Sequence, residues 1–187
     1  DSPQFTNTDP SLDSSALLST HIEMICAYIA GFVVLKLKKS IQCDQCAYAL
    51  TSPAGSSPMY NLIRKKSRGH LTFPSPDVVK ICLACEKLFR CHVSSHSHDL
   101  SNCKISSIVM MVLQTFIGVD FFPSLTQHMF DSSPMENHIV HLVKAVSEKY
   151  LQVRYYYAAK HYSANLKSHL SKVSRQRSTR LIIFSGL

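Results

Sequence analysis

The sequence predicts a mainly α-helical bundle with a small Cys-x-x-Cys knuckle and one long C-terminal helix. Apolar residues recur three and four positions apart through most of the chain, and almost no segment alternates with the period of two typical of a strand. Helix start signals, a Ser cap followed by Pro, stand at Ser75 and Ser133. Neither Pro nor Gly occurs between Pro134 and Gly186, so one helix can continue through that whole stretch.

The N-terminal part should contain one helix behind a polar leader. Residues 1–12 are rich in Ser, Thr, Asp and Pro, which predicts a disordered lead-in to one helical domain over residues 13–187. Asp13 or Ser14 is the expected N-cap of a first helix that runs to about Lys39. The basic residues at its end suit the negative pole of the helix dipole.

Two apolar runs raise the question of a membrane span. Met24–Leu35 is shorter than the roughly 20 residues that a helix needs to cross a bilayer. Ile105–Phe122 is longer but is interrupted by Ser106, Gln114 and Asp120. We therefore expect two buried core helices and no membrane partner.

The middle of the chain predicts two more helices and a short element. The first runs from the Ser75 cap to about Cys91, and a polar, His-rich loop over 92–102 follows it. The second helix should extend from Ser101 through about residue 119, and the short element covers 124–130.

The long C-terminal helix should start at Pro134, inside the capping box Ser133-Pro134-Met135-Glu136. Its apolar stripe steps by three and four and consists of Ile139, Val143, Val146, Tyr150, Val153 and Tyr157. We expect it to reach the 160s, with Ser174 as its outer limit. The apolar end Leu181–Phe184 is expected to fold back onto the bundle.

The formal net charge of +8 is concentrated at one end of the chain. Residues 1–143 hold 11 basic and 11 acidic residues, whereas residues 144–187 hold nine Lys and Arg against the single acid Glu148. This distribution is typical of a domain that binds a polyanion such as nucleic acid. From charge alone, a solvated helix face with a basic tail is an equally good interpretation.

Composition also excludes several enzyme classes. Only five glycines are present and they are scattered, so no glycine-rich phosphate-binding loop can form. The acids are sparse and no Ser/His/Asp or Cys/His grouping is supported by its local sequence. The sequence therefore predicts no catalytic residue and no small-molecule substrate.

Cys43-x-x-Cys46 is the best metal signal in the chain. Two thiolates at this spacing can reach one tetrahedral zinc ion, although the pair is only half a site. The polar Asp44 and Gln45 between them suit a loop. A redox role lacks the strand-then-helix setting of a thioredoxin-like site. The odd number of cysteines, seven, and the polar N-terminus favour a reducing compartment over a disulfide framework.

The remaining cysteines and histidines give weaker signals. Cys82-x-x-Cys85 lies within a predicted helix, where small buried side chains are the preferred interpretation. The Cys and His residues of 91–103 have irregular spacing typical of a polar loop. His138-x-x-His141 would complete a Cys₂His₂ site with the knuckle, because residues three apart share a helix face. Without further support, two ordinary surface histidines are the preferred interpretation.

Aromatic and basic residues alternate near Tyr155-Tyr156-Tyr157. Stacking on bases is one interpretation of this run. Because Tyr150 and Tyr157 lie in the apolar stripe, we expect both in the core. Better candidates for phosphate contacts are Arg154, Lys160, Lys167, Lys172, Arg175, Arg177 and Arg180.

Four stretches, taken in order, suggest a family. They are Tyr28–Val34 followed by Cys43-x-x-Cys46, Arg68–Ser75 with Val78–Arg90, His138–Tyr157, and Arg180–Phe184. Together they resemble the C-terminal part of P-element-type DNA transposases, including those with an N-terminal THAP zinc domain. The resemblance covers about residues 22–187.

The resemblance implies a fragment, or a degenerate copy, of a nuclear transposase. Such enzymes resemble RNase H-fold nucleases, whose acids hold two Mg²⁺ ions for DNA strand transfer. This chain lacks the family's Glu-containing stretch, THAP domain and GTP-binding insertion, so no catalytic residue carries over and Mg²⁺ belongs to the parent enzyme. The resemblance strengthens zinc at Cys43 and Cys46, and it strengthens His138 as a ligand because a His opens the corresponding family helix. His141 stays a candidate from its spacing alone.

These observations lead to two functional hypotheses. The first is a DNA-binding and assembly module of a transposase, with phosphate contacts from the basic C-terminal helix and a homo-oligomeric partner. The second is a helical protein-interaction or oligomerisation module without DNA contact.

Overall fold

The structure is a computed structural model of the chain, and it describes residues 10–53, 57–67, 69–95, 105–125 and 138–184. In chain order the elements are α1 (Pro10–Leu37), α2 (Asp44–Ala49), the 3-10 turn η1 (Pro58–Tyr60), α3 (Asn61–Lys66), α4 (Pro76–Ser95), α5 (Ile105–Thr115), the 3-10 turn η3 (Pro123–Leu125) and α7 (His138–Phe184). No strand forms within these ranges, where Thr51 and Pro74 make only an isolated bridge. The predicted mainly α class is confirmed.

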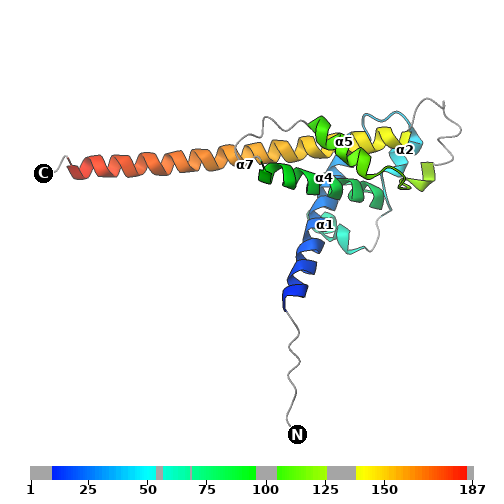
Figure 1. The fold of residues 1–187 in the computed structure, drawn as a ribbon, viewed down its shortest axis with the longest axis horizontal. Coiled ribbons are helices and arrows are strands. Elements are labelled where there is room, and N and C mark those ends of the chain that lie inside the picture. The colour runs from blue at the N-terminus through cyan, green and yellow to red at the C-terminus, as the bar shows by residue number, and fades with distance from the viewer. Residues whose placement is uncertain (1–9, 54–56, 68, 96–104, 126–137, 185–187) are drawn as a thin grey trace, which may run out of the picture.

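Figure 1 shows that the molecule has two parts. The elements α1, α4 and α5 pack around the first half of α7, α3 packs on α1, and α2 lies beside the start of α7; we call this assembly the helical body. Beyond it α7 continues as a single helix toward the C-terminus. Residues 160–184 of α7 are called the projecting arm.

The first helix begins earlier than its sequence predicted. It starts at Pro10, so residues 10–12 are helical and not part of a lead-in, while 1–9 lie outside the described residues. Proline is accepted in a first turn because its missing N–H has no partner there in any helix. The buried positions Ala27, Ala30, Val33 and Val34 show the expected helical spacing.

Packing explains part of the apolar character of α1. The segment Ser19–Leu37 is long enough and apolar enough, at a mean hydropathy of 1.5, to meet the composition test for a membrane span. Its buried face packs against α3, α4 and α7. At Gly31 a side chain would meet the backbone oxygen of Thr72 at 2.6 Å, so only glycine allows this close approach.

The cap predicted for α4 is confirmed. Pro76 is the first helical residue, and the Val78 amide donates to Ser75 Oγ at 3.4 Å. The helix continues past the predicted end at Cys91 to Ser95, so residues 92–95 are helical and not part of the predicted loop. The rest of that loop and the Ser101 cap lie outside the described residues.

The element α5 is shorter than predicted. It ends at Thr115 instead of residue 119, because Gly118 adopts a positive φ of 77° that stops the helix. The following turn η3 covers the first part of the short element expected over 124–130, whose later residues are not described.

The helix α7 is longer than expected and corrects one prediction. The capping box at Pro134 lies outside the described residues, and the described helix begins at His138. It extends beyond Ser174 to Phe184, so Leu181–Phe184 continues the helix away from the body and does not fold back onto it (Figure 1). The reason is that no Pro or Gly interrupts the stretch, so nothing turns the chain.

A buried charged cluster joins three helices at the centre of the body. The Glu86 carboxylate, 3% exposed, accepts from Arg154 Nε at 2.7 Å, from Arg90 Nε at 2.8 Å and from the Tyr150 hydroxyl at 2.9 Å. Because the Tyr150 proton goes to Glu86, the Cys26 thiol is left to donate to the Tyr150 oxygen, 3.4 Å away. The cluster therefore ties α4 and α7 to α1.

Candidate functional site

The Cys-x-x-Cys pair lies at the N-terminal end of α2, and not in a loop as predicted. Cys43 is the residue before the helix, with φ −83° and ψ 116°, and Asp44 and Gln45 form the first turn. An acid in the first turn is favoured by the helix dipole. Cys46 follows one turn after Cys43, so both thiols lie on one side of α2.

His138 reaches this pair from the start of α7. Its Nδ1 lies 3.2 Å from Cys46 Sγ, although the two residues are 92 positions apart. The ligand atoms of Cys43, Cys46 and His138 all lie within 4.8 Å of one another. The structure thus brings together three of the four residues predicted to bind metal.

His141 lies beside the three clustered ligands. It lines the same hollow of about 330 Å³, which Ile41, Gln42, Leu142 and Ala145 also line. Its side chain is exposed, and it does not belong to the group within 4.8 Å. Residues three apart on α7 share a face, so its imidazole is near the position that a fourth ligand would need.

The donor set fits a tetrahedral zinc ion. Zn–S bonds of about 2.3 Å and Zn–N bonds of about 2.0 Å place ligand atoms about 3.5 to 3.8 Å apart, which is the scale of this cluster. Burial, together with the hydrogen bond and negative charge of Cys43, raises the pKa of Cys46 to about 12. Two thiols this close resist joint ionisation unless a cation lies between them.

The other cysteine pair is part of the core. Cys82 and Cys85 are both 0% exposed within the buried cluster, which confirms them as small buried side chains. Burial raises the pKa of Cys85 to about 12, so its thiol stays protonated. Cys91 is exposed on α4, and the remaining members of the predicted Cys/His loop, 96–103, are not described.

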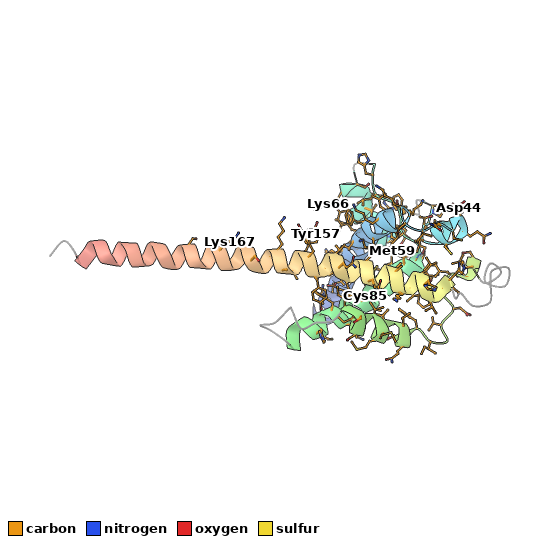
Figure 2. The ribbon with its side chains drawn as sticks, turned by 90° about the horizontal axis from the view of Figure 1, so that it is seen from above. Asp44, Met59, Lys66, Cys85, Tyr157 and Lys167 are labelled. Carbon is orange, nitrogen blue, oxygen red and sulfur yellow. The ribbon has the colours of Figure 1, made fainter. Side chains whose placement is uncertain are left out.

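The predicted phosphate-contact residues have different environments. Lys160 and Lys167 are exposed, and Figure 2 shows Lys167 on the projecting arm. Lys172, Arg175, Arg177 and Arg180 lie on the same helix, with side chains outside the description. Arg154 instead gives two hydrogen bonds to Glu86, at 2.7 and 2.9 Å, within the body.

The tyrosines of α7 correct a further prediction. Tyr150 is 0% exposed, as expected, but Tyr157 is 57% exposed although it continues the apolar stripe. The reason is that α7 leaves the body near this residue, so no neighbouring element covers it (Figure 2). Sequence periodicity shows which face is apolar but not where its packing partner ends.

Two features of the molecule, the Glu86–Arg154 ion pair and a hollow between α1 and α7, are not visible in the sequence. Glu86 is an isolated acid in the sequence, and only the packing of α4 on α7 brings Arg154 to it. Phe32 and Lys36 of α1 lie beside Tyr156 of α7 in one hollow. No local pattern could have identified either, because both depend on contacts between distant segments.

Comparison with known proteins places the chain among transposase C-terminal domains. The family model of the DNA transposase THAP9 C-terminal domain matches residues 15–160, and the chain belongs to this family. Human DNA transposase THAP9 is 28% identical over 159 residues, covering 83% of this chain. The chain spans 17% of the length of that relative. No solved structure matches.

Proposed function

We propose that this chain is a DNA-binding and assembly module of a transposase in the nucleus. The observation that carries the proposal is the projecting arm. It stands apart from the body and holds six Lys and Arg but no Asp or Glu. A transposase must hold DNA, and a basic helix against which none of the described elements packs is suited to phosphate contacts.

The proposed contacts come from the arm and not from the body. Lys160 and Lys167 are exposed there, and Lys172, Arg175, Arg177 and Arg180 follow on the same helix. Arg154 is omitted from this surface, because its charge is already compensated by the buried Glu86 carboxylate, which accepts two of its hydrogen bonds.

The metal centre is proposed to be structural. Cys43, Cys46 and His138 would hold a zinc ion, with His141 as the fourth ligand. When bound, the ion would link the start of α2 to the start of α7. No residue of this chain is proposed as catalytic, and Mg²⁺ is assigned to the parent enzyme.

Fluorescence anisotropy with a labelled DNA duplex tests the proposal. The affinity should fall steeply with salt, because each phosphate contact releases counterions. Replacing Arg175, Arg177 and Arg180 by Gln should reduce both the affinity and the salt dependence, whereas Lys87→Gln on α4 is the matched control. Tight binding by the triple variant would contradict the placement on the arm.

The second candidate is an oligomerisation module, favoured by the unpartnered length of α7. Sedimentation with and without DNA separates the two. A DNA-independent dimer with no DNA-dependent shift would favour oligomerisation alone and would contradict DNA binding.

A further inference from the structure

A second hollow lies where α7 crosses α1, close to the origin of the projecting arm. Its volume is about 350 Å³, within the range of small-molecule sites. It is lined by Phe32 and Lys36 of α1 and by Lys149, Gln152, Val153, Tyr156 and Tyr157 of α7.

Three aromatic side chains of this hollow are unusually exposed. Phe32 is 38% exposed, Tyr156 63% and Tyr157 57%. The two tyrosine rings meet edge to face, with centroids 5.4 Å apart and an interplanar angle of 79°. An edge-to-face contact covers one face of only one of the two tyrosine rings, and exposed aromatic side chains grouped at one point are typical of a binding site.

The charges around these rings are all positive. Lys36 and Lys149 line the hollow, and no acid does. The Lys36 ammonium lies 5.3 Å from the centre of the Phe32 ring, and Lys149 donates to Gln152 Oε1 at 3.3 Å. A ligand of this hollow would therefore have a flat apolar part and a negative part.

Two cations of the arm lie on the same face of α7 as Tyr156, which lines the hollow. Lys160 lies four residues after Tyr156, and Lys167 seven residues after Lys160, so all three side chains lie near one line along α7. One polyanion strand could follow this line and reach the aromatic rings.

We propose that this hollow binds an unpaired base of single-stranded DNA. The base would stack on one of the two tyrosine rings and meet the edge of the other, while Lys36 and Lys149 contact the flanking phosphates. A duplex keeps its bases stacked inside, so the hollow distinguishes a single-stranded end from a blunt one. An acidic peptide would use the cations but leave the aromatic faces without a partner.

This inference rests on the proposed DNA binding and deepens it. The test compares two labelled DNAs that share one duplex, one blunt and one with a single-stranded overhang, by anisotropy with the 187-residue chain. The overhang should bind roughly tenfold more tightly, and Tyr156→Ala with Tyr157→Ala should remove that difference. Both residues are exposed, so the fold should persist in the variant.

Two further variants separate stacking from other effects. Tyr156→Phe with Tyr157→Phe keeps both rings and should retain the preference. Tyr48→Ala, on α2 and 75% exposed, is the control for removal of an exposed tyrosine. Circular dichroism of each variant shows that the helices are intact.

The outcomes distinguish the two proposals. Equal binding of blunt and overhanging DNA by the wild-type chain would overturn the base site and leave duplex binding by the arm intact. Absence of binding to either DNA would overturn both. A double alanine variant that keeps the overhang preference but loses binding to an acidic peptide or to a second copy would assign the hollow to a protein partner instead.

Discussion

The helical body and the projecting arm share the helix α7, but the burial and the charge of its side chains differ between the two regions. In the body, the α7 residues Val146, Tyr150 and Leu151 are 0% exposed. Arg154 of the same helix forms an ion pair with the buried carboxylate of Glu86. In the arm, the same helix carries six cations and no acid, and its described side chains are exposed.

This difference shows which region stabilises the fold and which is free for the proposed binding. Most helical stability in proteins comes from packing an apolar face, and among the described elements none packs on the arm (Figure 1). The family match ends at residue 160, which is where the arm begins. The comparison therefore assigns folding to the body, and the polyanion contact that we propose falls to the arm.

The largest expected effect comes from the proposed metal centre of the body. A ligand that binds only the folded state at a thousandfold excess over its Kd stabilises by about 4 kcal/mol. Zinc should therefore raise the free energy of unfolding by this order, measured by urea denaturation with zinc and with a chelator. Cys46→Ser should remove the response, whereas Cys91→Ser, at an exposed cysteine on α4, should keep it. An identical response in wild type and Cys46→Ser would contradict the site.

The buried cluster should give the next largest effect. Removing one partner of a buried ion pair costs about 3 to 5 kcal/mol, and the lower figure applies because Arg90 is 54% exposed. We expect Glu86→Ala to lower the free energy of unfolding by about 3 kcal/mol. Lys87→Gln, the exposed neighbour, should change it by less than about 0.5 kcal/mol. Comparable losses in the two variants would show that the cluster does not hold the body together.

Helix periodicity and caps made most of the body predictable. The Ser75 cap and the stripe from Ile139 to Tyr150 depend on neighbouring residues, and both predictions are confirmed. The exposure of Tyr157 could not be predicted, because it depends on where other elements end.

The metal centre was only half predictable for a similar reason. The spacing of Cys43 and Cys46 is local and visible in the sequence. His138 lies 92 residues after Cys46, and its contact with Cys46 depends on how the fold brings the start of α7 to α2. The sequence could therefore offer it only as one candidate among ten histidines.

The pH dependence of the free energy of unfolding should show a smaller effect, which comes from Glu86. Burial alone would raise the pKa of Glu86. The hydrogen bonds from Arg154, Arg90 and Tyr150, together with the positive charge of Arg154, lower this pKa below its ordinary value of 4.5. A carboxyl with a lowered folded pKa stabilises the fold above its unfolded pKa, and that contribution is lost as the pH falls through the folded value.

The free energy of unfolding should therefore decline below about pH 4.5 more steeply in wild type than in Glu86→Gln. Urea denaturation from pH 6 to pH 3, with a chelator throughout so that metal release does not contribute, measures this. Parallel pH profiles for the two proteins would contradict the assignment.

Truncation of the arm should have the smallest effect on folding and separates the two regions directly. Ending the chain after Lys160 removes five cations of the arm but no residue of the buried core. We expect the free energy of unfolding to change by less than about 0.5 kcal/mol, because surface changes away from packed features have effects of this size. Affinity for duplex DNA should fall markedly and lose most of its salt dependence.

A truncated chain that unfolds much more easily would show that the arm packs on the body in solution, and the division of roles between the two regions would then be wrong.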